Sequence, residues 1–217
     1  GIDANAPLVI VGDCMEALEA LGRAARDRTR AAVIAVTGSV GKTGTKDALN
    51  LAFGALGTTH ATQGNLNNHI GVPLTLARLP RDTDFAIIEM GMNHPGEITE
   101  LSKLARPDVA IITTIAAVHL EFFDSVAEIA DAKAEIFDGM SPGGIAILNR
   151  DNVYFAILAS RAWAHGLEHV VGFGAHPEAD SQLSAYTLNG DGSDVTARID
   201  DRIVRYSLSV PGRHWIH

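Results

Sequence analysis

A short glycine-rich stretch that ends in a lysine and a threonine has the clearest chemical potential in this sequence. Residues 33–49 read VIAVTGSVGKTGTKDAL, an apolar run followed by glycines and then by a helical pattern. The stretch matches the phosphate-binding P-loop, G-x-x-x-x-G-K-[ST], except that Val36 replaces the first glycine. A strand that delivers such a loop to a helix start aims backbone N–H groups and the helix dipole at an anion. We therefore expect a phosphate site, against the alternative of a glycine-rich turn that binds nothing.

The side chains of this loop suit the phosphates of a nucleotide together with a magnesium ion. Lys42 would hold β- and γ-phosphate oxygens, and the Thr43 hydroxyl would bind Mg²⁺. The predicted nucleotide-binding residues of the loop are Gly38, Ser39, Val40, Gly41, Lys42, Thr43 and Gly44.

Two further polar residues follow apolar strands. The apolar residues 85–88 end in Glu89, and a carboxylate at such a strand end reaches the metal or its waters in P-loop proteins. His119 follows the next strand, at the edge of an open α/β sheet where ligands bind. The alternatives are a buried carboxylate satisfied by local hydrogen bonds and an ordinary loop histidine. We predict that Glu89 serves a metal, and for His119 the metal ligand and the loop residue both stay open at this point.

The composition limits the class of protein. The chain has 217 residues, a net charge of −9 and one cysteine, Cys14. The negative charge disfavours a nucleic-acid partner, and the single cysteine excludes an internal disulfide and fits a reducing cytosol. No apolar run reaches the roughly 18–20 residues that cross a bilayer, and the start GIDANAP has no signal-peptide pattern. We expect a cytoplasmic protein without membrane insertion.

Strand and helix patterns alternate along most of the chain, which predicts βαβ units around a mostly parallel sheet. The expected strands are 7–13, 31–38, 84–91, 108–115 and 143–149, and the expected helices are 14–27, 42–56, 94–105 (entered through Pro95), 124–138 and 152–165. From about residue 169, the segments VVGFG, SAYTLNGDG, DVTARID and RIVRYSLSV carry turn signals and predict antiparallel strands. The expected fold is an α/β P-loop domain with helices flanking the sheet, plus a small antiparallel β subdomain near the C-terminus.

Several motifs follow TGSVGKT in a fixed order: GNLNNHIGVPLTL (64–76), EMGMNHPGEI (89–98), HLEFFDS (119–125) and AKAEIF (132–137). Together they resemble the Mur ligases and folylpolyglutamate synthetases, whose ATP loop also lacks the first glycine. The resemblance runs from the loop to about residue 150 and is weaker beyond it. It implies three domains, with residues 1–30 ending the N-terminal one, 31–212 forming the central ATPase, and 213–217 leading to a further C-terminal domain.

The resemblance also implies an activity. EMGMNHPGEI points to the branch of the family that adds D-Ala-D-Ala to UDP-MurNAc-tripeptide in peptidoglycan precursor synthesis. Such ligases use ATP and Mg²⁺, phosphorylate a substrate carboxylate, and let an amine attack the acyl phosphate. We expect a monomer, and we expect weak ATP binding and no ligation from these 217 residues alone.

Residue roles carry over position by position. By resemblance, Thr43 and Glu89 hold the Mg²⁺ shared with the phosphates, and Glu89 and His119 serve a second metal region. Lys133 matches a lysine that is carbamylated in several members, a change that turns a cation into an anion.

Four asparagines and one histidine are assigned in the same way. Asn149 resembles an adenine contact, and His214, in GRHWIH, resembles part of a nucleotide-binding stretch. Asn65, Asn67 and Asn68 resemble a loop that meets the substrate near the γ-phosphate, against the alternative of turn-forming asparagines.

Three rival interpretations stay open. A sister ligase or a folylpolyglutamate synthetase-like enzyme would add a single amino acid. A GTPase or kinase is disfavoured by the absent first glycine and the lack of an N-K-x-D motif, which NRDN (149–152) does not satisfy. A non-catalytic ATP-binding module would release no phosphate in response to an amine. The sequence does not reveal the third residue of the tripeptide or the carbamylation state.

Overall fold

The structure is a computed structural model that describes residues 9–118, 122–210 and 212. His119 and His214, two of the predicted site residues, and residues 213–217 lie outside the described part. The predicted division into three domain segments stays a prediction.

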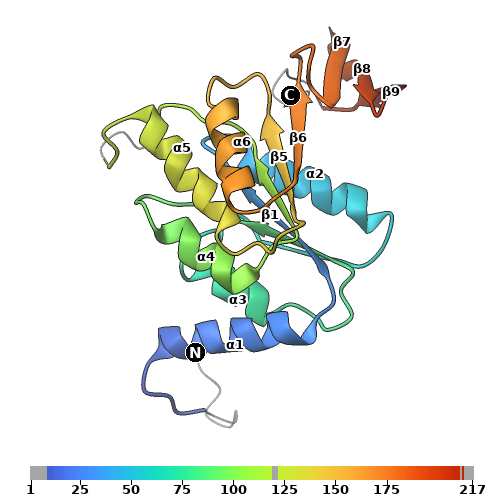
Figure 1. Cartoon of the computed structure of the whole chain (residues 1–217). Helices are drawn as coiled ribbons and strands as arrows, with labels where there is room; N and C mark the ends of the chain where they lie inside the picture. Colours follow the sequence, from blue (N-terminus) through green and yellow to red (C-terminus); the bar gives the residue numbers. More distant parts are fainter. Residues whose placement is uncertain (1–8, 119–121, 211, 213–217) are drawn as a thin grey trace.

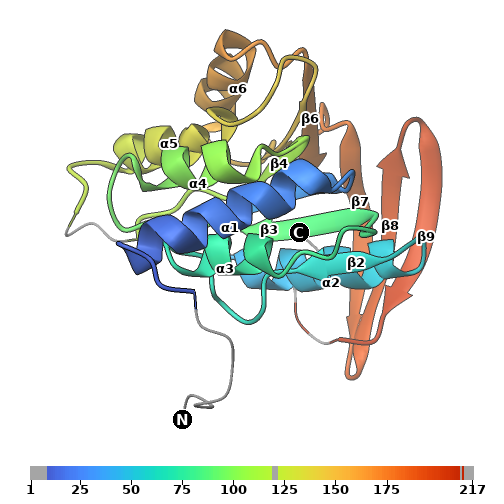
Figure 2. The same cartoon turned by 90° about the horizontal axis from the view of Figure 1, so that it is seen from below.

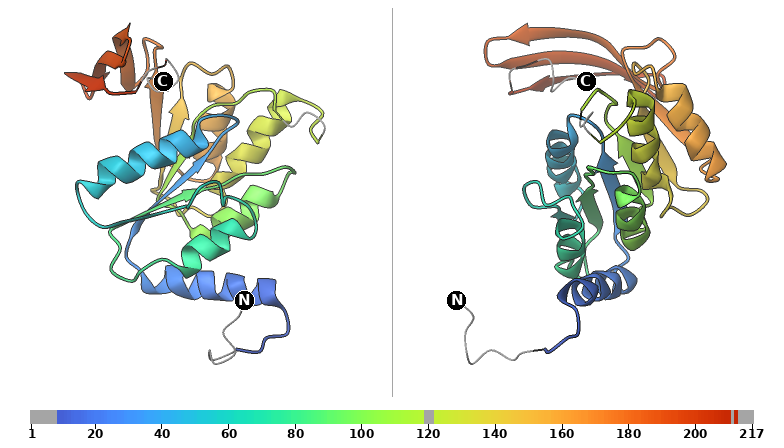
Figure 3. Two further views of the ribbon diagram at one scale, coloured as in Figure 1. Left: turned by 180° about the vertical axis from the view of Figure 1, so that it is seen from behind. Right: turned by 90° about the vertical axis from the view of Figure 1, so that its left-hand side faces the viewer.

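One sheet organises the described residues. Its strand order is β2-β3-β1-β4-β5-β6-β7-β8-β9, parallel from β2 to β7 and antiparallel from β7 to β9. The bounds are Ala32–Thr37 (β1), Thr59–Ala61 (β2), Phe85–Glu89 (β3), Val109–Ile112 (β4), Ile145–Asn149 (β5), His169–Gly174 (β6), Ser181–Asn189 (β7), Gly192–Ile199 (β8) and Arg202–Leu208 (β9). The predicted fold class is therefore confirmed, and β7–β9 project from one end of the molecule (Figures 1 and 3).

Helices cover both faces of the parallel strands (Figure 1). Their bounds are Cys14–Arg28 (α1), Lys42–Gly54 (α2), Gly71–Ala77 (α3), Glu97–Ala105 (α4), Val126–Ala134 (α5) and Phe155–Ala164 (α6), with a short 3₁₀ helix at Glu135–Phe137. On one face, Leu49 and Phe53 of α2 pack on strand residues such as Val36 and Ile87. On the other face, α3 to α6 bury the larger core. No helix among the described residues is long and apolar enough to cross a membrane.

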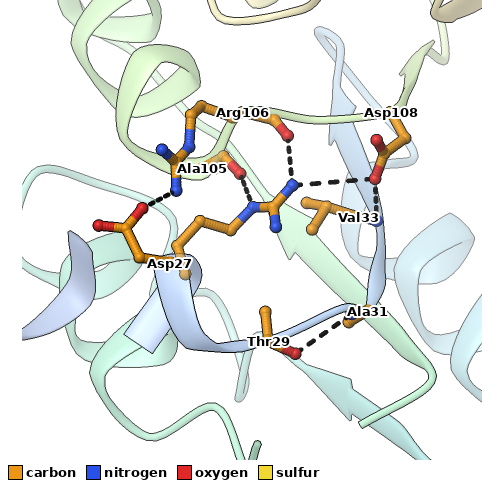
Figure 4. A network of polar contacts seen from close by, with 8 residues as sticks. Asp27, Thr29, Ala31, Val33, Ala105, Arg106 and Asp108 are labelled. Atoms are coloured by element: carbon orange, nitrogen blue, oxygen red, sulfur yellow. Dashed lines mark hydrogen bonds and ion pairs between the residues drawn. The ribbon is translucent and has the colours of Figure 1, made fainter. Parts of the chain in front are cut away.

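Helix α1 is fastened to the domain by a partly buried arginine, and it lies across α3 and α4 (Figure 2). Arg26 donates from Nε to Ala105 O at 2.7 Å and from Nη2 to Arg106 O at 2.9 Å (Figure 4). Those carbonyls end α4, so one guanidinium joins the two helices. Burial lowers the pKa of Arg26, and Asp108 opposes that effect.

Two strand predictions are wrong. The described part of the predicted strand 7–13 is not a strand, and its Val9 and Ile10 are 87 % and 95 % exposed. This apolar run has no neighbouring strand in the described chain, so its backbone gains no ladder hydrogen bonds. The segment VVGFG is a strand, β6, but it pairs in parallel with β5 through Ile147 and Val171. Turn-forming residues on either side of a segment indicate that it is a strand, but they do not determine which strand it pairs with or in which direction.

Two elements differ in smaller ways. Helix α4 begins at Glu97 after Gly96, whose φ of 88° sets the turn, rather than at Pro95. The predicted helix 124–138 ends its α-helical part at Ala134 and finishes as the 3₁₀ turn. The patterns did not predict β2 and α3, which lie between α2 and β3.

Candidate nucleotide and metal site

The P-loop joins β1 to α2 at the carboxyl edge of the parallel strands, the edge where open α/β sheets bind ligands. Gly38 and Gly41 have φ of 144° and 90°, values that side-chain-bearing residues rarely adopt. Gly41 is the N-cap of α2, and no side-chain cap bond is made to this helix start within the described residues. The first N–H groups of α2 are therefore available to an anion, as the sequence predicts.

Lys42 folds back over the loop that it follows. Its Nζ donates to Gly38 O at 2.8 Å. Burial lowers the pKa of Lys42, and the nearby Glu89 carboxylate partly offsets this. The ammonium is thus held between the loop and Glu89, where it can move onto a phosphate oxygen.

Glu89 is the buried acid of the site, at 1 % exposure. Its Oε1 accepts from Thr43 Oγ1 at 3.2 Å and from Asn67 Nδ2 at 2.7 Å. Its Oε2 is buried and has no hydrogen-bond partner among the described residues. A buried carboxylate oxygen without a donor is costly, so this oxygen is expected to face a cation or water.

The donor set fits magnesium. Thr43 and Glu89 offer a hydroxyl and a carboxylate, the hard oxygen ligands that Mg²⁺ takes together with phosphates and waters. The described residues contain no group of three or more His, Cys, Asp or Glu side chains able to hold a metal.

Lys133, on α5, is 2 % exposed and lies near enough to Lys42 for the two charges to interact. Burial and, to a smaller extent, the positive charge of Lys42 lower its pKa from 10.5 to about 7. A large share of this side chain is therefore a neutral amine near neutral pH, unlike an ordinary surface lysine on a helix.

The three predicted substrate asparagines have different environments. Asn67 reaches Glu89, and its carbonyl accepts from Gly91 N at 2.8 Å. Asn68 Oδ1 accepts from the N–H groups of Ile70 and Gly71, so it caps the turn into α3. Asn65 is exposed. The structure brings only Asn67 of the three to the acidic centre.

Asn149 ends β5 beside the end of β4. Its Nδ2 donates to Thr113 O at 3.1 Å, and its Oδ1 accepts from Asp151 N at 2.9 Å. Both polar ends of this amide are engaged within the protein, so an adenine contact by Asn149 stays a prediction.

Lys46 was not among the site residues predicted from the sequence. It is 3 % exposed, and its Nζ donates to Thr62 O at 3.0 Å and Gly64 O at 3.3 Å. Thr62 Oγ1 in turn accepts from Glu89 N at 3.0 Å. Lys46 follows Lys42 by four residues, which places both lysines on one face of α2, and this spacing is the sequence pattern that could have identified it. Lys46 thus ties the P-loop helix to the segment that leads to Asn67.

Comparisons with known proteins agree with this geometry. A family model described as the Mur ligase middle domain matches residues 36–217. The UDP-N-acetylmuramoyl-tripeptide–D-alanyl-D-alanine ligase of Escherichia coli strain K12 is 40 % identical over 220 aligned positions, covering 98 % of this chain and 47 % of that protein. The ligase of the same name from Rickettsia prowazekii is 36 % identical and covers 96 % and 46 %. The chain spans about half the length of the curated relatives it matches.

Solved structures show the same fold. MurF from Acinetobacter baumannii superposes with a TM-score of 0.89 at 32 % identity, covering 100 % of this chain and 46 % of that one. MurF ligase from Thermotoga maritima in complex with ADP gives 0.85 at 26 %, covering 100 % and 50 %. The apo form of L. casei FPGS gives 0.75 at 17 %, covering 97 % and 60 %, a likeness of fold alone.

Proposed function

The chain belongs to the Mur ligase family, and from that premise we propose that it is the ATP-binding part of a MurF-type ligase. The proposed enzyme joins D-Ala-D-Ala to UDP-MurNAc-tripeptide and cleaves ATP to ADP and phosphate. The names of the relatives at 36 % and 40 % identity support this choice over ligases that add a single amino acid.

One observation carries the proposal: Lys42, Thr43 and Asn67 converge on the buried Glu89, and one oxygen of Glu89 has no donor among the described residues. This arrangement places a cation and two oxygen ligands beside the open start of a helix. It suits a nucleotide triphosphate with Mg²⁺ better than a neutral ligand.

The chemistry follows from charge. A carboxylate oxygen of the tripeptide attacks the γ-phosphorus, the bond to the β-γ bridging oxygen breaks, and ADP leaves. The D-Ala-D-Ala amine then attacks the acyl carbon, loses a proton, and expels phosphate, so that an amide bond remains. Two anions must approach in the first step, and Lys42 lowers their repulsion. Mg²⁺, when held by Thr43 and Glu89, supplies further positive charge at the phosphates.

We also propose that Lys133 reacts with carbon dioxide. A neutral amine adds to CO₂ and releases one proton, which leaves a carbamate anion on Nζ. The pKa of about 7 supports this, because the reactive neutral amine is then abundant near neutral pH. The carbamate would remove the repulsion between the protonated Lys133 and Lys42 and offer oxygen ligands to a second Mg²⁺, together with Glu89 and His119.

We further propose a monomeric enzyme that acts in the cytoplasm on small-molecule substrates. The net charge of −9 disfavours a nucleic-acid partner, and the single cysteine fits a reducing cytosol. The roles of Asn149 and His214 toward the nucleotide, and of Asn65 and Asn68 toward the substrate, remain part of the same proposal.

The test is phosphate release from Mg-ATP by the full-length protein with UDP-MurNAc-tripeptide and a varied amine. We expect release that requires D-Ala-D-Ala and that Glu89→Gln abolishes, because the substitution removes the negative charge and keeps the shape. Release with a single amino acid would move the protein to a sister activity, and release indifferent to the amine would contradict the ligase assignment.

A further inference from the structure

The P-loop is held by the neighbouring strand end. Ser39 N donates to Thr114 O at 2.8 Å, and Ser39 Oγ exchanges hydrogen bonds with the backbone of Ala116. Thr113 N donates to Thr37 O at 3.0 Å, and Thr113 Oγ1 donates to Val40 O at 2.6 Å. The segment after β4 thus supports the loop at both of its ends.

Thr113 is the centre of this support, at 9 % exposure. A Cβ on Gly38 would lie 2.0 Å from Thr113 Oγ1, and a Cβ on Gly41 would lie 3.7 Å from Thr113 Cβ. The loop therefore curves around this one side chain, and the glycine at position 38 makes room for its hydroxyl.

The hydroxyl fixes one peptide unit. In a trans peptide the C=O and the following N–H point in opposite directions. Because Val40 O points at Thr113, the N–H of Gly41 points away from it. Gly41 is the N-cap of α2, so this N–H joins the donors at the helix start that can face an anion.

We propose that Thr113 is a positioning residue for ATP: its hydroxyl holds the Val40–Gly41 peptide so that the Gly41 N–H faces the phosphates. This inference rests on the proposed function, since it assumes that the loop binds a nucleotide. The inference also gives the segment after β4 a role in shaping this P-loop, in which Val36 occupies the position of the usual first glycine.

Three substitutions of Thr113 distinguish the effect of its hydroxyl group on ATP binding from the effect of its methyl group. Thr113→Val places a methyl group where an oxygen now lies 2.6 Å from Val40 O, a distance too short for carbon and oxygen, so the peptide must shift. Thr113→Ala removes the hydrogen bond without that crowding, and Thr113→Ser keeps the hydroxyl. Thr75→Val is the matched control, because Thr75 is a buried threonine whose hydroxyl donates to Gly71 O at 2.8 Å, inside α3.

The experiment measures the Kd of Mg-ATP by calorimetry and KM and kcat for the full-length protein. For Thr113→Val and Thr113→Ala we expect about tenfold weaker ATP binding, the scale of one lost buried hydrogen bond, with kcat reduced less than about threefold. Thr113→Ser should bind within about threefold of wild type, and Thr75→Val should lower the unfolding temperature without changing the Kd.

Wild-type affinity in both Thr113→Val and Thr113→Ala would overturn the inference while leaving the proposed function intact. A tenfold loss in Thr113→Ser as well would also overturn it, because the methyl group rather than the hydroxyl would then matter. Absence of Mg-ATP binding in the wild type would overturn the proposed function, and this inference with it.

Discussion

Replacing Lys133 by methionine is expected to stabilise the folded chain at neutral pH. The lysine is 2 % exposed, and burial, followed by the charge of Lys42, lowers its pKa from 10.5 to about 7. One pKa unit corresponds to about 1.36 kcal/mol. At pH 7, where half of the folded-state side chain is protonated, the shift costs the fold about 4 kcal/mol relative to an unfolded chain with an ordinary lysine. Methionine has a similar length and carries no charge to desolvate.

The pH dependence has a definite sign. Between about pH 7 and 10.5 the unfolded chain binds more protons at this residue than the folded chain does, so the free energy of unfolding rises with pH. At pH 9 the cost falls to about 2 kcal/mol. The advantage of Lys133→Met over wild type should therefore shrink by about 2 kcal/mol from pH 7 to pH 9.

Urea unfolding at pH 7 and at pH 9 measures this difference. The buffers should be free of carbon dioxide and contain a chelator, so that the amine carries neither carbamate nor metal. Lys103→Met is the control, because the Lys103 side chain is 56 % exposed and should show no such pH dependence. If Lys133→Met is no more stable than wild type at pH 7, or if its advantage is the same at both pH values, Lys133 is not a desolvated cation and the reasoning is wrong.

Three other substitutions probe the supports of the site. Asn67→Ala removes a donor to Glu89, so Mg²⁺ should bind about five- to tenfold more weakly in a metal titration of the ATP complex; unchanged affinity would contradict this. Lys46→Met leaves two loop carbonyls without their donor and should cost about 2–3 kcal/mol in urea unfolding, and a loss below about 0.5 kcal/mol would show that the contacts are dispensable. Arg26→Ala should cost about 2 kcal/mol and speed amide exchange in α1, while equal exchange rates would show that α1 is held by packing alone.

The sequence predicted the residues whose roles depend on local pattern. The P-loop follows from glycine spacing between a strand and a helix, and Glu89 follows from its place at the end of an apolar strand. The structure places the loop between β1 and α2 and Glu89 at the end of β3, and the charge of Lys42 acts on Lys133, while their roles toward ATP and Mg²⁺ stay predictions. Lys133 itself came from family resemblance, because helical periodicity alone would make it a solvated lysine.

The contacts that were missed join distant segments. Asn67 meets Glu89 across 22 positions, and Thr113 meets Val40 across 73, which no local pattern encodes. The direction of β6 and the absence of a strand at Val9 depend on which strands are available as neighbours. Local β propensity does not contain that information.

The most direct test of the proposed ligase chemistry follows one oxygen atom. The tripeptide of UDP-MurNAc-tripeptide is labelled with ¹⁸O in its terminal carboxylate and turned over by the full-length protein with Mg-ATP and D-Ala-D-Ala. Attack of that carboxylate on the γ-phosphorus predicts that one labelled oxygen appears in the released phosphate. Amide product accompanied by phosphate without label would contradict the acyl-phosphate route, and with it the proposed roles of Lys42, Thr43 and Glu89.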